Sequence, residues 1–110
     1  RKNLALRLNS GGRSIFYSGD GNMTPSSREL AIHCSLAVHE AFTVQPLAGG
    51  HSSVQECLDM AAQAGVQALA LVHIQRSERD KVKQFDVQEL QARAGCPVYV
   101  PEPGFSLILE

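Results

Sequence analysis

The sequence predicts an α/β domain built on a mixed β-sheet with helices on one face. Two short apolar segments, 3–9 and 13–18, flank a glycine-containing turn and predict an antiparallel hairpin. Beyond residue 18, helix signals alternate with short apolar runs, which is typical of strands joined by helices. The two later predicted helices each have one narrow apolar stripe, so we expect the helices to cover one face of the sheet. The length of 110 residues fits a single domain.

The first half of the chain contains the hairpin, a helix and a third strand. Leucines occupy every second position within 3–9, which predicts a half-buried strand. Thr24 followed by Pro25 is a helix start, because threonine caps the first turn and proline fits its first position. We expect this helix to run to about His33 and a short strand to follow at 35–39.

The middle of the chain contains the clearest helix. Ser53 and Glu56 form a capping-box pattern, and Gly65 is suited to end the helix. Apolar residues recur at helical spacing between them, at Val54, Cys57, Leu58, Ala61 and Ala62. Residues 66–72 are continuously apolar and predict a buried strand.

The last third predicts one more helix and two short strands. Residues 75–83 are polar and charged, which indicates a solvated loop or a helix start. An N-cap pattern at Asp86 predicts a helix that Gly95 ends. Residues 97–100 form a short predicted strand, and the apolar stretch 105–109 a terminal one.

One face of this sheet lacks a predicted cover. The 66–72 strand is apolar on both sides, and the predicted helices account for only one of them. We therefore expect a second protein segment, or a second copy of the chain, to pack on the other face.

Composition argues against several classes of function. The formal net charge of −1 gives no basic surface for nucleic acid, and with 5% aromatic residues and no tryptophan a stacking platform for single strands is not expected. Hydrophobic residues make up 44% of the chain, yet no apolar run approaches the roughly 20 residues of a membrane span. Three widely spaced cysteines, Cys34, Cys57 and Cys96, indicate packed, reduced thiols in a cytoplasmic protein.

Three apolar runs end in residues capable of acid–base or metal chemistry. Asp20 follows the run at 14–17, Glu40 follows 36–38, and His73 follows 68–72. Residues just beyond the carboxyl ends of parallel strands lie where ligands bind in α/β folds. If the three strands share one direction, these side chains line one edge of the sheet.

The chemistry of these residues suits a divalent metal ion, although each residue also has an ordinary structural explanation. A carboxylate from Asp20 and an imidazole from His73 match zinc or a similar ion, but a zinc site needs three or four protein ligands. His51 lies in a loop next to two glycines, where it could pack on the following helix or donate a proton. Glu40 could accept a hydrogen bond from His51 and raise its basicity. The remaining histidines, His33 and His39, have structural explanations.

Four motifs together resemble the metallo-β-lactamase-fold hydrolases, and most of all ribonuclease Z and related phosphodiesterases. The motifs are Ser18-Gly19-Asp20, His39-Glu40-Ala41-Phe42, Gly50-His51-Ser52-Ser53 and Leu71-Val72-His73-Ile74. The resemblance implies that Asp20 bridges two divalent metal ions, zinc first with manganese or iron as options, and that His73 binds one of them. It also implies that His51, paired with Glu40, assists departure of the leaving oxygen.

The resemblance is incomplete in a way that implies a domain boundary. The His-x-His-x-Asp-His motif of this family and a further histidine ligand are absent from these 110 residues. Residues 1–110 are therefore expected to be the C-terminal half of the domain, which is half of a four-layer αββα sandwich. The implied substrate is a phosphodiester, either a small molecule or an RNA 3′ end. The alternatives are a thioester or lactone hydrolase and a non-catalytic interaction module.

Overall fold

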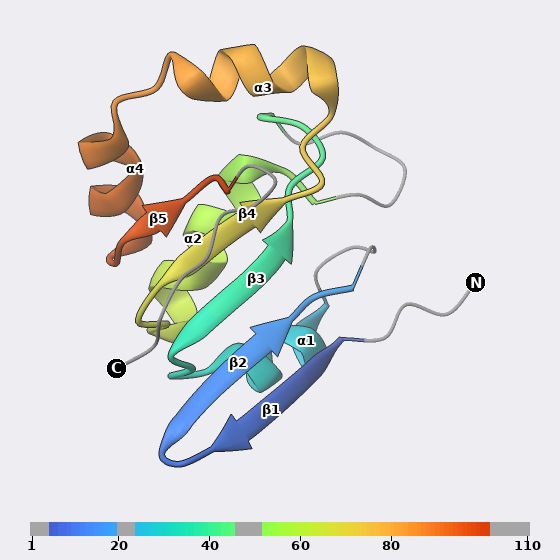
Figure 1. Ribbon diagram of the computed structural model, residues 1–110, viewed down its shortest axis with the longest axis vertical. Helices are drawn as coiled ribbons and strands as arrows, with labels where there is room; N and C mark the ends of the chain where they lie inside the picture. Colours follow the sequence, from blue (N-terminus) through green and yellow to red (C-terminus); the bar gives the residue numbers. More distant parts are fainter. Residues whose placement is uncertain (1–4, 20–23, 46–51, 102–110) are drawn as a thin grey trace.

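The computed structural model describes residues 5–19, 24–45 and 52–101, and these form one five-stranded sheet with four helices (Figure 1). The strands are β1 (Leu6–Ser10), β2 (Arg13–Tyr17), β3 (Leu36–Glu40), β4 (Leu69–Val72) and β5 (Val98–Tyr99). The helices are α1 (Pro25–Ala31), α2 (Val54–Ala64), α3 (Arg76–Lys83) and α4 (Val87–Ala94). The predicted terminal strand at 105–109 lies outside the described residues.

The strand order is β1-β2-β3-β4-β5, the same as the order along the chain. β1 pairs with β2 in the antiparallel direction, and every later pair is parallel. Parallel neighbours need crossover connections, and these have one preferred hand. Because each later strand is added at the same edge of the sheet, crossovers of one hand place their helices on the same face.

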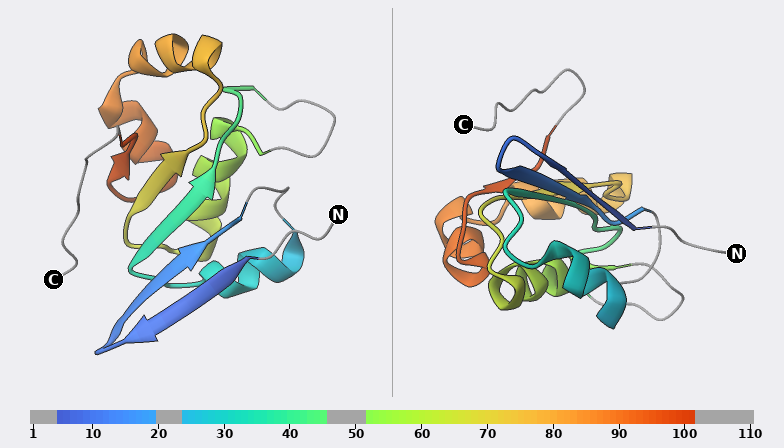
Figure 2. Two further views of the ribbon diagram at one scale, coloured as in Figure 1. Left: turned by 45° about the vertical axis from the view of Figure 1, so that its right-hand side comes forward. Right: turned by 90° about the horizontal axis from the view of Figure 1, so that it is seen from below.

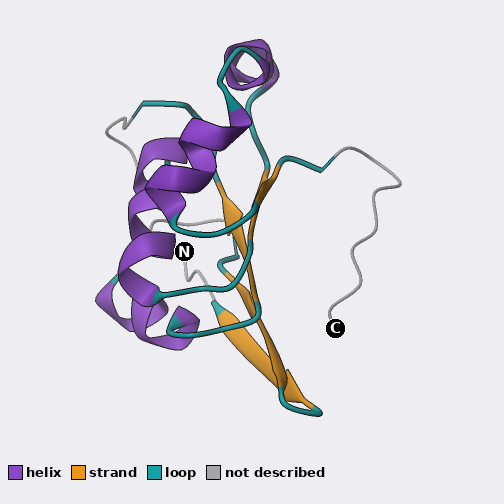
Figure 3. Ribbon diagram, turned by 90° about the vertical axis from the view of Figure 1, so that its left-hand side faces the viewer, coloured by secondary structure: helices purple, strands orange, loops and turns teal. Residues whose placement is uncertain are grey.

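Helices and sheet form two layers (Figures 2 and 3). In the described part of the chain, α1, α2 and α4 lie on one face of the sheet, while α3 lies beyond the carboxyl ends of β3 and β4. The predicted α/β mixed sheet with helices on one face is confirmed. In the described residues, no helix combines the length and apolar character that crossing a bilayer requires.

The core lies between the sheet and the helices. Phe16, Ala37 and Leu69 are in register on neighbouring strands and are almost fully buried. Side chains of α2 fill the space above them, with Leu58 and Met60 among the most buried. The predicted stripe on α2 is correct except at Ala62, which is exposed.

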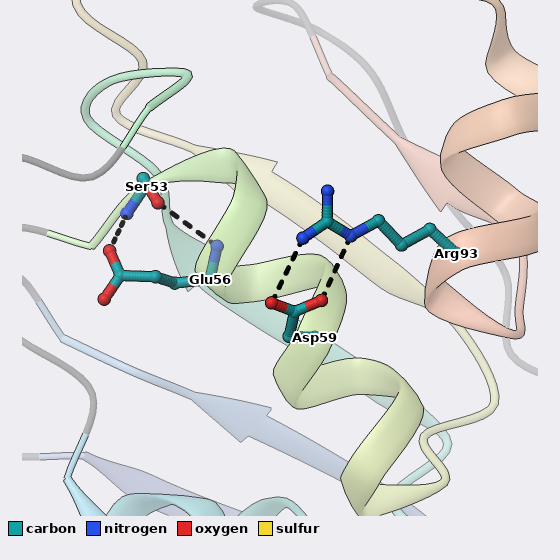
Figure 4. A network of polar contacts seen from close by, with 4 residues as sticks. All are labelled: Ser53, Glu56, Asp59 and Arg93. Carbon is teal, nitrogen blue, oxygen red and sulfur yellow. Dashed lines mark hydrogen bonds and ion pairs between the residues drawn. The ribbon is translucent and has the colours of Figure 1, made fainter.

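A capping box fixes the start of α2, and an ion pair joins α2 to α4 (Figure 4). Ser53 and Glu56 form the predicted capping box, with each side chain accepting a hydrogen bond from the other residue's backbone N–H at 3.0–3.1 Å. Arg93 of α4 donates two hydrogen bonds to Asp59 of α2, at 3.0 and 3.2 Å. The polar contacts therefore set where α2 begins and how α4 docks against it.

Of the two predictions for residues 75–83, the helix start is confirmed and the loop is wrong, because residues 76–83 form α3. In α3, Val82 is buried and points to the core. It is an apolar anchor that is not evident from the mainly charged sequence of this helix. Glu78 also turns inward: it accepts a hydrogen bond from the backbone N–H of Val44 at 3.0 Å and pairs with Lys81 at 2.6 Å. These bonds hold the pKa of Glu78 below its usual value.

The face of the sheet opposite the helices exposes apolar side chains near its β1 edge. The exposed fractions are 43% for Leu6, 63% for Leu8 and 37% for Tyr17. Leu6 is paired with Tyr17, and Leu8 with Ile15, so these side chains share one face. The prediction that β1 is half-buried is therefore not met in this chain, because the described residues leave its apolar side open.

Candidate functional site

The carboxyl ends of β2, β3 and β4 lie side by side at one edge of the sheet (Figure 1). The register pairs Tyr17 with Val38 and Glu40 with Val72, in parallel orientation. The condition set by the sequence, that the three strands share one direction, is thus met. Glu40 and His73 both lie at this edge. Asp20 lies outside the described residues, but the backbone reaches the same edge at Gly19, the residue before it.

Ser18 links the turn that precedes Asp20 to the backbone of Glu40. Its hydroxyl accepts a hydrogen bond from the Glu40 backbone N–H at 3.0 Å and donates one to the Gly19 carbonyl at 2.9 Å. Gly19 has a φ of 72°, a left-handed conformation that glycine adopts without a steric cost. The serine and glycine of the first motif therefore have a local structural role: they shape the end of β2.

Glu40 is the last residue of β3, and its side chain is almost completely buried, with 2% of the residue exposed. An ionised carboxylate at such a position needs hydrogen-bonding partners or a neighbouring cation. Its burial sets it apart from the exposed carboxylates of a solvated surface.

His73 follows β4 and adopts a left-handed backbone conformation, with φ at 60°. This conformation is uncommon for a residue with a Cβ and costs free energy unless the surroundings impose it. Hydrogen bonds on both sides impose it here: Ala41 N–H to Val72 O, and Gln75 N–H to Phe42 O, both at 2.9 Å. The sharp turn leaves the imidazole exposed at the rim, where it can bind a ligand.

His51 lies outside the described residues, but the segment that follows it is hydrogen-bonded to the residues that follow β3. The backbone N–H of Phe42 donates to Ser52 O at 2.8 Å, and that of Val54 donates to Thr43 O at 2.8 Å. Thr43 and Ser53 also form an isolated parallel bridge. Residue 52 is thus bonded to a residue two positions from Glu40.

A cleft of about 630 Å³ lies beside this edge. One wall is the segment that follows β3, and the other is α3 with the residues around it; the lining residues are Thr43, Val44, Gln45, Gln75, Glu78, Lys81, Gln84 and Phe85. Gln75 is two residues from His73, so the cleft begins where the rim residues end.

Among the described residues, no group of three or more His, Cys, Asp or Glu side chains is arranged to hold a metal ion. Of the predicted site residues, Glu40 and His73 are described, whereas Asp20 and His51 are not. The donor types fit a divalent ion, since an exposed imidazole and an aspartate are common zinc ligands. The described part of the chain supplies one of these, His73, and a complete site needs further ligands.

Sequence reasoning did not predict the contacts of two residues beneath this edge. His39 and Cys57 both contact the backbone carbonyl of Glu40. The structural interpretation of His39 is confirmed, because its ring is buried and bonded to the backbone. The three cysteines are free and buried, as expected.

No protein-family model matches the chain. Among curated proteins, it is 36% identical over 88 residues to the ribonuclease Z of Brevibacillus brevis, a match that covers 76% of this chain and 28% of that protein. It is 30% identical over 98 residues to the ribonuclease Z of Natronomonas pharaonis, covering 84% of this chain and 32% of that protein. The matches therefore span less than a third of these relatives' length.

Solved structures show the same fold. The metallo-β-lactamase fold protein YhfI from Bacillus subtilis aligns with a TM-score of 0.77 at 21% identity, over 92% of this chain and 42% of YhfI. A diphosphatase from the PhnP family aligns with a TM-score of 0.58 at 12% identity, over 94% of this chain and 41% of that protein. The five-stranded mixed sheet with its helices is thus part of a metallo-β-lactamase fold, related in sequence to ribonuclease Z.

Proposed function

We propose that this chain forms part of a dinuclear, metal-dependent phosphodiester hydrolase. The observation that supports it best is the shared edge at the carboxyl ends of β2, β3 and β4. Each of these strands leads into a residue with metal or acid–base chemistry, at the place where α/β folds bind ligands. The similarity to ribonuclease Z proteins and to a diphosphatase supports a phosphorus-containing substrate.

In this proposal Asp20 and His73 hold the metal ions. Two divalent ions, zinc or alternatively manganese or iron, supply Lewis-acid polarisation of the phosphate and a nucleophile at neutral pH. His73 is held at the rim by its fixed backbone turn. The remaining ligands come from a segment outside these 110 residues, which makes residues 1–110 the C-terminal half of the domain.

Glu40 and His51 act on the leaving group. The buried carboxylate of Glu40 accepts a hydrogen bond from the imidazole of His51 and fixes its orientation. The other ring nitrogen of His51 donates a proton to the departing oxygen. The bonding of Ser52 to Phe42 supports this pairing, because it ties the residue next to His51 to the segment that contains Glu40.

The uncovered face of the sheet supports a partner for this half-domain. Leu6, Leu8 and Tyr17 expose apolar surface that a second sheet of the same domain would cover. A homo-oligomer that covers the same face is the alternative partner.

The substitution His51→Ala tests the proposed chemistry. In the complete polypeptide that contains residues 1–110, it should lower the turnover of bis(p-nitrophenyl) phosphate by about 10²–10⁴-fold, the usual contribution of a general acid. The metal content should stay the same, because His51 is not a ligand. His33→Ala is the matched control: His33 is exposed and lies outside the site.

An unchanged turnover in His51→Ala would contradict the role of this histidine. Hydrolysis of a thioester or lactone in preference to the phosphodiester would favour that class of hydrolase. A wild-type polypeptide that binds no metal and hydrolyses none of these substrates would be the non-catalytic interaction module.

A further inference from the structure

Side chains bind both backbone polar groups of Glu40. The hydroxyl of Ser18 accepts from its N–H, as described above. On the other side, the carbonyl oxygen of Glu40 lies 2.8 Å from Nδ1 of His39 and 3.3 Å from Sγ of Cys57. His39 belongs to β3 and Cys57 to α2, so this carbonyl joins the sheet to the helix layer.

The direction of these bonds follows from their chemistry. A carbonyl oxygen only accepts, so Nδ1 of His39 carries the proton and the thiol of Cys57 donates its own. The sulfur lies 3.4 Å from the same ring nitrogen, so the three groups form one compact cluster. Both side chains are at most 1% exposed.

Burial favours the uncharged form of each donor. It lowers the pKa of His39, against a weaker opposing effect of the bond to Glu40 O and the charge of Glu56. It raises the pKa of Cys57 far above the usual thiol value. Nε2 of His39 is buried and has no hydrogen-bond partner among the residues that the structure describes, which fits a ring that donates through Nδ1 alone.

We propose that His39, held as its Nδ1–H tautomer, and Cys57 are positioning residues that fix the backbone of Glu40 at the rim of the site. Neither residue touches substrate. They act through Glu40, whose carboxylate must stay aligned with its partner through the catalytic cycle. This role rests on the proposed function for its effect on turnover, but the anchoring of the Glu40 backbone is independent of it.

Two substitutions at His39 separate a donor role from simple packing. The side-chain amide of asparagine places a nitrogen donor near the position of Nδ1, whereas that of glutamine reaches the position of Nε2. Glutamine is closer to histidine in volume. A purely structural role therefore predicts that His39→Gln is tolerated better, and the positioning role predicts that His39→Asn is.

The first measurement is hydrogen exchange at the backbone N–H of Glu40, in the complete polypeptide. Loss of the anchor should raise its exchange rate about tenfold or more in His39→Gln, but less than about threefold in His39→Asn. Nitrogen-15 NMR of the imidazole should show the Nδ1–H tautomer at neutral pH. Equal exchange in the two variants, or the Nε2–H tautomer in the wild type, would overturn the proposal.

The second measurement is turnover of bis(p-nitrophenyl) phosphate at saturating metal. His39→Gln should lower kcat by about 10- to 100-fold with little change in KM, because misplacing a catalytic group by about 1 Å can cost 10²-fold.

Cys57→Ala and Cys57→Ser form a second pair of variants if His39→Gln does not fold. Only the serine keeps a hydrogen-bond donor, so only the alanine should raise the exchange rate at the Glu40 N–H. If the wild type does not hydrolyse the substrate, the proposed function fails, whereas the exchange data still decide the anchoring.

Discussion

At the scale of single residues, the most informative side chain is the buried imidazole of His39. Its environment explains why a histidine, and not an apolar residue, lies at the end of β3: the ring fills core space and donates one hydrogen bond to Glu40 O. The sequence predicted a structural role for it. It did not predict the contact with Cys57, because that pair is brought together only by the packing of α2 on the sheet.

His39 makes stability dependent on pH in a defined direction. The pKa of His39 in the folded state lies below its unfolded value of about 6.5. At pH values between these two pKa values, the unfolded state therefore binds more protons than the folded state. This contribution to stability is complete above pH 6.5 and is lost as the pH falls below it. We expect the urea midpoint to drop between pH 7.5 and 5.5, and to drop less in His39→Asn. An equal drop in both proteins would contradict this assignment.

The edge formed by the carboxyl ends of β2, β3 and β4 was partly predictable from the sequence. Apolar runs that end at Asp20, Glu40 and His73 predicted three strand ends, and the parallel register of β2, β3 and β4 confirms that these strands share one edge. The left-handed turn at His73 could not be predicted, because hydrogen bonds from a distant segment impose it on a residue that does not favour it. The roles of Asp20 and His51 stay predictions.

At the scale of elements, helix caps were predictable because they depend on residues within one turn of each other. Ser53 with Glu56, and the glycines after α2 and α4, mark helix boundaries as expected. α3 was the exception. Its sequence is dominated by charge, and its buried contacts, through Glu78 and Val82, depend on the segment 43–45 and on the core.

The two C-cap glycines provide a matched pair of substitutions. Gly65 and Gly95 have left-handed φ values of 64° and 76°, so alanine at either position should destabilise the protein by about 1–2 kcal/mol. A Cβ at Gly65 would also lie 2.9 Å from Cδ2 of His33, whereas a Cβ at Gly95 meets nothing within 4 Å. Gly65→Ala should therefore lower the free energy of unfolding more than Gly95→Ala does. The reverse order in urea unfolding would contradict the contact at His33.

At the scale of the whole molecule, the sheet is covered by helices on one face and exposes leucine side chains on the other. Alternation along the strands and the count of predicted elements were enough to predict this asymmetry. The sequence could not identify what covers the face opposite the helices, because an apolar surface does not specify which protein segment packs on it. Burial of apolar area contributes roughly 25 cal/mol per Å², so covering a whole face of the sheet contributes several kcal/mol, which is large beside a typical total stability of about 5–15 kcal/mol.

We therefore expect the isolated 110-residue chain to self-associate. In sedimentation velocity it should form dimers or larger species, and Leu8→Lys, on the open face, should reduce this association. Ile32→Lys is the matched control, since Ile32 is 45% exposed but follows α1 on the helix side. The isolated chain should also bind divalent metal weakly. A stable monomer that binds two ions tightly would contradict the half-domain proposal.

The proposed function is tested most directly by the metal dependence of phosphodiester hydrolysis in the complete polypeptide that contains residues 1–110. The rate with bis(p-nitrophenyl) phosphate is measured after chelation of metal, and again after zinc or manganese is restored. We predict that hydrolysis disappears on chelation, returns with metal, and is lowered about 10²-fold or more in Asp20→Asn, the scale of one lost electrostatic contact to the transition state. Hydrolysis that persists without metal, or that is unaffected in Asp20→Asn, would contradict the proposed function.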